Sequence, residues 1–432
     1  MRTALHARPP THPGLNDGLI HPGSDFPIHS ALRVIRSKAL ERGPMHGALR
    51  IIVVLAEFTD RKMGASKQHY EELFFSTGVL QNGSVKEYFD EVTNGKVDIV
   101  GEVVGPYTLP NTLAEYANND FGTSRYGMNA RLMARHAAEA ANPDVDFAPY
   151  DNDGDGYVDA FIVVHAGQGA EMTGDVNDIW SHKWVLPDAA YNADGTRVYG
   201  YLTVPEDAKI GVCCHELGHL LFGFPDLYDI DDSSEGIGNW CLMGGGSWLG
   251  GGDIPAHPSA WCKLQQDWAT SVNVTSNQEL QIQDVKTGFK IYRLWKDGTA
   301  NQEYFLVENR QKSGYDQLLP GEGLLVWHID DDIETNSDEA HPKVALVQAD
   351  TLKDLENGNN RGDDGDPFPG SQANRVFDTV SNPGSKSYAS VHTCVALRDI
   401  SDSGATMMAR VEVSCPDEPV SFWVRLWRWF FG

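Results

Sequence analysis

The segment 213–229, CCHELGHLLFGFPDLYD, places His215, Glu216 and His219 in the pattern His-Glu-x-x-His. Residues four apart lie on one face of a helix, so the two imidazoles can bind the same metal ion. Zinc suits such nitrogen ligands; it polarises a carbonyl and lowers the pKa of the water it holds toward about 7. Glu216 lies next to that face, where its carboxylate can take the proton of this water. The spacing predicts a zinc-dependent hydrolytic centre, although three fixed letters also match by chance.

The third zinc ligand must come from the chain after the second histidine. Gly223 can end the helix and Pro225 cannot continue it, so the chain can double back toward the metal. Asp226 is the nearest carboxylate that such a turn would deliver. Asp229 and Glu235 remain open as alternatives, and Asp226 would then be an ordinary turn carboxylate. We predict a zinc site made by His215, His219 and Asp226.

A second candidate metal site precedes the histidine motif. The segment 151–159, DNDGDGYVD, has carboxylates at loop positions one, three, five and nine and a glycine at six, from Asp151, Asp153, Asp155, Asp159 and Gly156. Calcium loops use this alternation, and Tyr157 would add its backbone carbonyl. Ile162 stands where an EF-hand has its last glutamate, so we predict a shorter calcium loop that leads into a strand, with an acidic turn as the alternative. The segments 328–336 and 361–370 are looser calcium candidates.

These residues need a scaffold of helices and strands. Apolar runs at 48–58 and 157–169 predict buried strands, and we expect the second to form the upper edge of a substrate cleft. Helices are predicted at 66–75, 84–93, 124–142 and 206–222, and the segment 96–110 is predicted to form strands that turn at Gly105-Pro106. His165, Glu171 and His182 would line the cleft or serve the structure. From about residue 275 short strands and turns predict a mostly β region.

Composition narrows the class of protein. The chain has 432 residues, 41% of them hydrophobic, which suits a folded protein with a large core. Its net charge of −27 argues against a nucleic-acid partner. Of six cysteines, Cys213 and Cys214 are adjacent on a helix and should not pair, whereas Cys394 and Cys415 lie in two β-like runs that an oxidising compartment would join.

The two ends of the chain differ from the rest. Residues 1–45 contain no apolar signal-peptide core and resemble a leader or propeptide segment. The tail 417–432 is rich in Trp and Phe beside arginines, so it would contact a membrane surface, or else pack on its own domain or be cut off.

With these motifs together, the sequence resembles the immune inhibitor A-like family of secreted zinc metallopeptidases. The likeness spans about residues 45–415 and includes HELGHLLFGFPDLYD, YDNDGDGYVDAFIVVHAGQGAE and MGGGSW, where Met243 stands as in a methionine turn. It implies an α+β protein: a metzincin-like catalytic domain, with a mixed sheet and an active-site helix, followed by a mostly β C-terminal domain. Phe222 is one residue more than the commoner spacing has before the glycine.

We therefore expect an exported zinc endopeptidase with one catalytic zinc and one or more structural calcium ions, in which Glu216 assists zinc-bound water. The expected domains are 1–45, 46–272, 273–416 and 417–432. Its partners would be protein or peptide substrates, and we expect a monomer. A zinc hydrolase of another substrate, or an inactive binding protein stabilised by calcium and zinc, are the alternatives.

Overall fold

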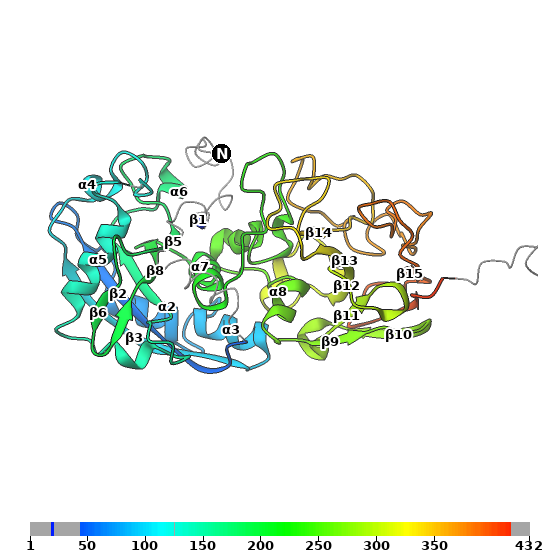
Figure 1. Ribbon diagram of the computed structural model, residues 1–432, viewed down its shortest axis with the longest axis horizontal. Coiled ribbons are helices and arrows are strands. Elements are labelled where there is room, and N and C mark those ends of the chain that lie inside the picture. Colours follow the sequence, from blue (N-terminus) through cyan, green and yellow to red (C-terminus); the bar gives the residue numbers. More distant parts are fainter. Residues whose placement is uncertain (1–18, 21–43, 125, 416–432) are drawn as a thin grey trace, which may run out of the picture.

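The computed structural model describes residues 19–20, 44–124 and 126–415. A six-stranded sheet lies at one end of the molecule, and two sheets formed by later residues lie at the other (Figure 1). The helix α7 (Ile210–Phe222), which carries the histidine motif, lies between them. The chain thus has the mixed α and β content that its sequence predicts.

The six-stranded sheet is mixed. Its strands, in spatial order, are β1 (Leu19–Ile20), β5 (His182–Val185), β8 (Gly200–Pro205), β4 (Phe161–His165), β2 (Gly47–Glu57) and β3 (Val97–Thr108). The strands β8, β4, β2 and β3 run parallel, while β5 is antiparallel to β8 and parallel to β1. Because β4 is hydrogen-bonded to a neighbour on both sides, the prediction that it forms an edge for substrate is wrong.

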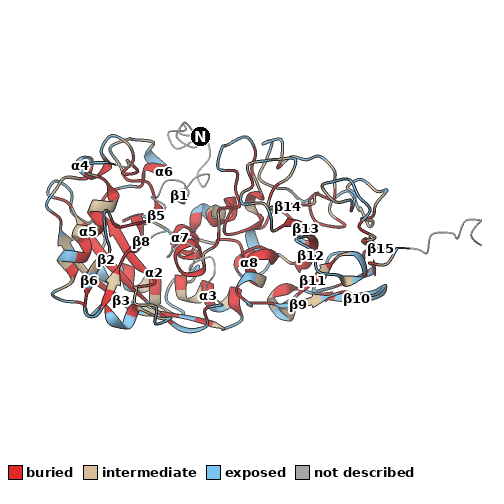
Figure 2. Cartoon of the chain, viewed as in Figure 1, coloured by how far each residue is buried: buried red, intermediate tan, exposed pale blue. Residues whose placement is uncertain are grey.

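Helices cover both faces of this sheet, which explains the continuous apolar runs of its central strands. Alternate residues of β2 point to opposite cores: Ile51 and Val53 to one, Ile52 and Val54 to the other. The first core contains α2 (Lys67–Phe75), α3 (Val85–Thr93) and α7, and the second contains α4 (Leu113–Ala117) and α5 (Ala130–Ala141). Figure 2 shows the resulting burial along the central strands and α7.

Three predicted boundaries need correction. The helix predicted from 124 begins at Ala130, because the Asn129 side chain caps it by accepting the amide of Leu132 at 3.0 Å. The metal helix begins at Ile210 and not at 206, since a turn precedes it. The strand β3 continues through Gly105-Pro106, where a shift in register against β2 accommodates the proline.

The later residues form a five-stranded and a three-stranded sheet. The first contains β14 (Val344–Leu346), β13 (Gly323–Asp330), β12 (Glu303–Arg310), β11 (Lys290–Leu294) and β9 (Thr270–Asn273). The second contains β10 (Gln278–Gln283), β16 (Thr406–Glu412) and β15 (Ala396–Arg398). In the chain, the short helices α8 (Ala260–Gln265) and α9 (Val285–Gly288) flank the strands β9 and β10. The short helix α6 (Ala170–Thr173) and the β6–β7 hairpin (Tyr191–Ala193, Thr196–Val198) lie between β4 and β8.

One hydrophobic core extends from α2, α3 and α7 into the five-stranded sheet. In β12 and β13, Leu306, Leu325 and Trp327 share a core with α7, while Phe305 and Val326 face the three-stranded sheet. The two predicted units, 46–272 and 273–416, therefore share one apolar core.

A buried charge cluster joins the same two regions. Arg310 on β12 donates to Asp316 at 2.7 Å and to Glu308 at 3.3 Å, and Lys263 on α8 donates to Glu308 at 3.2 Å. Asp316 also accepts the backbone N–H of His257 at 3.0 Å, and all four charged side chains are at most 1% exposed. Burial opposes ionisation of Asp316, but Arg310 and His257 outweigh it and hold its pKa far below the usual range. These contacts fix the chain after the metal loop to β12.

Replacing Asp316 with Asn should destabilise the protein strongly, since it leaves the buried Arg310 without its main counter-charge. We expect the free energy of unfolding in urea to fall by about 3–5 kcal/mol. Glu139→Gln, which breaks the exposed pair with Arg135, should cost less than about 0.5 kcal/mol. Equal effects of the two substitutions would contradict this role of the cluster.

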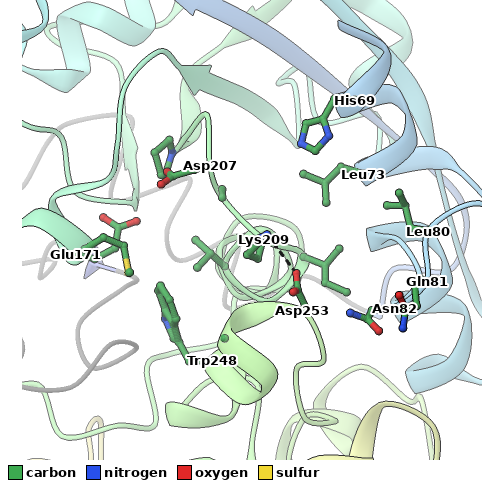
Figure 3. Close-up of a pocket in the computed structure, with 17 residues that line it drawn as sticks. His69, Leu73, Leu80, Gln81, Asn82, Glu171, Asp207, Lys209, Trp248 and Asp253 are labelled. Carbon is green, nitrogen blue, oxygen red and sulfur yellow. Dashed lines mark ion pairs between the residues drawn. The ribbon is translucent and has the colours of Figure 1, made fainter. Parts of the chain in front are cut away.

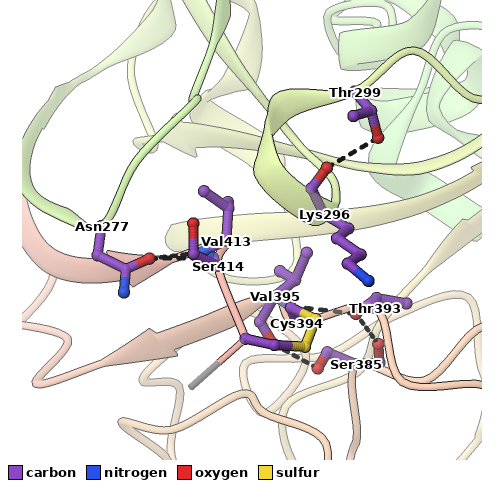
Figure 4. The surroundings of a disulfide bond; sticks show 10 residues. Asn277, Lys296, Thr299, Ser385, Thr393, Cys394, Val395, Val413 and Ser414 are labelled. Atoms are coloured by element: carbon purple, nitrogen blue, oxygen red, sulfur yellow. Dashed lines mark hydrogen bonds between the residues drawn. A yellow bond between two sulfur atoms is a disulfide. The ribbon is translucent and has the colours of Figure 1, made fainter. Parts of the chain in front are cut away.

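Cys394 and Cys415 form the predicted disulfide, with their Cα atoms 4.8 Å apart (Figure 4). It links the chain before β15 to the chain after β16. The other four cysteines are free and buried. Nearly all of the predicted leader and the whole predicted tail 417–432 lie outside the described residues.

Candidate metal centre

The histidine motif lies on a helix that is buried along its whole length. Every residue of α7 is buried, including His215, Glu216 and His219 at 0% exposure. The helix ends at Gly223 in the left-handed conformation (φ 69°), where the amides of Gly223 and Phe224 bond back to the last turn. This turn reverses the chain toward the helix.

The reversal brings Asp226 to the two histidines. Its Oδ1 lies 3.0 Å from Nε2 of His219 and 3.3 Å from Nε2 of His215, and the two Nε2 atoms are 3.0 Å apart. Asp226 is 8% exposed, and its Oδ1 has no hydrogen-bond donor. Three ligand atoms of the kinds that zinc prefers thus converge in a buried site.

Each imidazole is oriented by a backbone carbonyl. The Nδ1 atom of His215 lies 2.9 Å from the carbonyl oxygen of Leu242, and that of His219 lies 2.6 Å from the carbonyl oxygen of Phe224. A proton on Nδ1 in these contacts leaves the lone pair of Nε2 directed at the site, as metal-binding histidines require. The donor set therefore fits a zinc ion.

The electrostatics favour a neutral His219 beside an ionised Asp226. Burial lowers the pKa of His219, and Asp226 only partly opposes this effect. Burial would raise the pKa of Asp226, but the neighbouring His219 and His215 outweigh it and hold this pKa below its usual value. These are the protonation states in which an imidazole and a carboxylate act as metal ligands.

The additional residue Phe222 does not displace Asp226. It completes the last turn of α7 and packs edge-on against Trp268 at a ring distance of 4.8 Å, with Phe89 at 5.3 Å on another side. Its side chain thus fills the core beneath the helix end, and the loop to Asp226 starts from a firmly held position.

Met243 supports the helix from below. A Cβ atom at Gly218, between the two histidines, would stand only 2.7 Å from the Met243 sulfur. The carbonyl of Met243 accepts the amide of Leu227 at 2.8 Å. The residue predicted to form a methionine turn therefore contacts both the helix and the loop that carries Asp226.

The two alternative third ligands are engaged elsewhere. Asp229 accepts the amides of Asp231 and Ser234 at 3.1 and 2.8 Å, and Glu235 pairs with Arg361 at 3.1 Å. Neither belongs to the group of ligand atoms around the histidines.

The predicted calcium loop assembles in part. Asp151, Asp153 and Asp159 bring carboxylate oxygens together, and Oδ1 of Asp151 is buried without a hydrogen-bond partner. Asp155 is not in this group, and it accepts the amide of Tyr157 at 2.9 Å. The ring of Tyr157 lies 3.8 Å beneath the guanidinium of Arg197.

Two more acidic groups occur among the described residues. Asp363 and Asp366, from the looser candidate segment 361–370, meet Asp350, and the other group contains Asp229, Asp231 and Glu339. Burial, reinforced by the charge of Asp363, raises the pKa of Asp366 to about 7. The segment 328–336 contributes to neither group. Sequence reasoning missed the second group because Glu339 is over a hundred residues from its partners.

Two of the three residues suggested to line the cleft belong to the core. His182 is fully buried, with Nδ1 2.7 Å from the carbonyl of Trp180 and Nε2 2.8 Å from the hydroxyl of Tyr201. Burial lowers the pKa of His182 and of His165 to about 4. Glu171 accepts the amide and hydroxyl of Ser181 at 3.2 and 2.6 Å.

The low pKa of His182 makes stability depend on pH. Between pH 4 and 6.5 the unfolded chain binds a proton that the folded chain does not, so stability rises with pH across this window and is lost as pH falls. His182 should account for a change on the order of 3 kcal/mol. The free energy of unfolding of His182→Gln should fall less steeply between pH 6.5 and 4.5 than that of the wild type. Parallel curves would contradict this assignment.

Comparison with known proteins identifies the family. Residues 50–274 match the family described as "Immune inhibitor A peptidase M6, catalytic domain". The chain belongs to this family. The resemblance predicted from the motifs is thereby confirmed, and α7, Asp226 and Met243 all fall within the matched residues.

Two named relatives agree with this assignment. The chain is 28% identical over 301 residues to the "Pre-pro-metalloprotease PrtV" of Vibrio cholerae serotype O1. The aligned segment covers 60% of this chain and 32% of the relative. The chain is 29% identical over 252 residues to the "Immune inhibitor A" of Bacillus thuringiensis subsp. alesti, which covers 46% of this chain and 36% of that relative. The matches thus span about a third of the length of these curated relatives.

Proposed function

We propose that the chain is a zinc-dependent endopeptidase that hydrolyses peptide bonds of proteins. The observation that carries this proposal is the meeting of His215 Nε2, His219 Nε2 and Asp226 Oδ1 in one buried site, beside Glu216 on the same helix. Membership of a peptidase family and the similarity to a protein named a metalloprotease support it.

We propose that His215, His219 and Asp226 hold the zinc ion. Structural zinc sites usually close with four protein ligands, whereas catalytic sites use three and keep one position open. The group of ligand atoms in the described part of the chain contains three. When bound, zinc supplies Lewis acidity toward water and toward the substrate carbonyl.

Glu216 is the proposed general base and acid. Its carboxylate would accept a proton from the attacking water and then donate it to the nitrogen of the leaving amine. Glu216 follows the first histidine directly and is fully buried, so bulk water would not compete for this proton. The carbonyls of Leu242 and Phe224 hold the two imidazoles in place throughout.

Replacing Glu216 with Gln should abolish casein hydrolysis while zinc remains bound, because the amide cannot accept a proton and is not a ligand. We expect kcat to fall by about 10²–10⁴-fold. The zinc content of the purified protein is measured at the same time. Chelation should remove the activity of the wild type, and added zinc should restore it. A variant that still cleaves casein would show that Glu216 is not the base.

Measurement of bound zinc in a matched pair of variants tests the ligand role of Asp226. Asp226→Asn should weaken zinc binding by more than about 100-fold, whereas Glu235→Gln should leave it unchanged because Glu235 pairs with Arg361. Zinc loss in the Glu235 variant alone would assign the third ligand to that residue.

We further propose that the loop 151–159 binds calcium through Asp151, Asp153 and Asp159. Three carboxylates within 4.8 Å repel one another unless a cation lies between them. The loop precedes β4, so an ion there would stabilise the start of a central strand. Asp155 and Tyr157 would contribute through the shape of the loop.

Calcium should raise the Tm of the wild type, and Asp151→Asn should reduce that increase by at least half because it removes one carboxylate. Asp297→Asn, a substitution in an exposed turn elsewhere, should leave the increase unchanged. Differential scanning calorimetry with and without calcium measures both. An unchanged calcium response in Asp151→Asn would place the ion in another acidic group.

The remaining parts of the proposal concern architecture and location. We propose a metzincin-like catalytic unit over 46–272 and a β unit over 273–416, in a protein that acts outside the cell as a monomer on protein substrates. The mixed sheet, in which β5 runs antiparallel to β8, supports the metzincin-like unit. None of the helices in the described ranges is long and apolar enough to span a bilayer. Activity found only in the cell fraction would contradict the proposed location.

A further inference from the structure

Two free cysteines lie in contact next to the residues that support α7. Cys241 and Cys262 are both 0% exposed, and the thiol of Cys262 donates a hydrogen bond to the sulfur of Cys241. They come from neighbouring segments, since the amide of Leu242 donates to the carbonyl of His257 at 3.3 Å. The fold thus brings together two thiols that are far apart in the sequence.

Ser259, the N-cap of α8, contacts both sulfur atoms. Its amide donates to Sγ of Cys241 at 3.1 Å, and its hydroxyl donates to Sγ of Cys262 at 3.4 Å. The amide of Met243 also donates to Sγ of Cys241, at 3.3 Å. A disulfide requires the two sulfur atoms to approach to about 2.05 Å. Because Ser259 holds both sulfurs and the two side chains already touch, the pair is placed for this bond.

The two sulfurs differ in acidity. Burial raises the pKa of Cys241, but hydrogen bonds from Cys262 and from two backbone amides outweigh it and lower this pKa to about 7. Burial, reinforced by Cys241, raises the pKa of Cys262 well above its usual value. Thiol–disulfide exchange begins with a thiolate, so Cys241 is suited to attack and Cys262 to complete the bond. Burial raises the pKa of Cys213 and Cys214, which favours the inert thiol in both.

The segment between the two cysteines packs along α7. A Cβ atom at Gly211, in the first turn of the helix, would stand only 1.9 Å from the carbonyl oxygen of Ser247. Just before the helix, Lys209 pairs with Asp253 at 3.6 Å (Figure 3). The same segment supplies the carbonyl that orients His215. A bond that closed this segment into a ring would therefore restrain the support of the helix.

We propose that Cys241 and Cys262 form a second disulfide, and that this bond fastens the segment 241–262 against α7. The structure describes the reduced form of the pair. Cys394 and Cys415 are already joined, as in proteins that fold under oxidising conditions. The proposal does not depend on the proposed endopeptidase activity.

The oxidant is a small disulfide such as oxidised glutathione. The Cys241 thiolate attacks one sulfur of this oxidant, which forms a mixed disulfide and releases a first thiolate. The Cys262 thiol gives its proton to that thiolate, and its sulfur then attacks Sγ of Cys241 and releases the second thiolate. Two electrons thus pass from the protein to the oxidant. Because both sulfurs are buried, the exchange takes place while the chain folds or opens locally.

Peptide mapping tests the bond in the full chain. The chain is reduced with dithiothreitol and then held in a glutathione buffer with urea below its unfolding transition, so that it can open locally. Free thiols are blocked with N-ethylmaleimide, and a protease that cleaves after Asp and Glu places the two cysteines in separate peptides, 236–253 and 254–267. Mass spectrometry should find these peptides joined and lighter by two hydrogen atoms than their sum.

The same sample contains its own control, because Cys394 and Cys415 should rejoin under these conditions. Separate, blocked peptides 236–253 and 254–267 from chains in which that bond has rejoined would overturn the proposal. A bond from Cys241 to Cys213 or Cys214 would overturn it as well. This readout comes from the wild-type chain, so it does not require any variant to fold.

Two matched variants identify the sulfurs. Cys241→Ser should leave Cys262 blocked by N-ethylmaleimide in every chain. Cys214→Ser, which removes another fully buried cysteine, should preserve the joined peptides. Loss of the joined peptides in Cys214→Ser alone would contradict the assignment of Cys241.

Thermal unfolding tests whether the bond fastens the segment. In a chain with Cys394→Ser and Cys415→Ser, oxidation should raise the Tm by at least about 3 °C, because the new ring restricts the unfolded chain. The further substitution Cys241→Ser should remove this increase. Joined peptides with an unchanged or lower Tm would overturn the fastening role. None of these measurements involves catalysis, so a failure of the endopeptidase proposal would leave their results unaffected.

Discussion

The architecture depends on burying a helix on every side although it carries two imidazoles and a carboxylate. Taking such groups out of water is costly unless each finds a partner. The histidines of α7 satisfy Nδ1 with backbone carbonyls, and Asp226 approaches their Nε2 atoms. The cost of burial thus leaves few conformations open to these groups, and the same contacts that make burial tolerable also direct three ligand atoms to one point. The positions of these ligand atoms are therefore well defined because the site is buried from solvent.

The helix shares its hydrophobic core with residues far along the chain. Leu306, Leu325 and Trp327 complete the core beside α7, and the cluster around Arg310 anchors the region that follows the metal loop. The five-stranded sheet therefore contributes to the core in which α7 is buried. The helix α7 thus links the scaffold to the group of His215, His219 and Asp226.

The sequence predicted those features that depend on short-range patterns. The two histidines, the stop at Gly223 and the buried strands were readable because helix period, glycine conformation and β-branched runs act locally. The early start predicted for α5 overlooked the cap at Asn129, and β4 was misplaced because strand order is not encoded locally. The core shared by α7 and β12 had no sequence signal, since alternate residues of one strand serve two different cores. The group of Asp229, Asp231 and Glu339 likewise contains residues that only the fold makes neighbours.

The loop that bears Asp226 is held by residues that follow it by a hundred positions or more. Asn336 donates to the carbonyl of Leu227 at 2.7 Å, and the carbonyls of Leu355 and Arg361 accept the amides of Glu235 and Asn239 at 2.9 and 2.8 Å. A ribosome makes the histidine helix long before it makes these anchors. The nascent chain therefore contains both histidines but lacks a fixed position for Asp226, the proposed third ligand. The carboxylate of Asp226 would take its position only after residues 336–361 have been made and have folded against its loop.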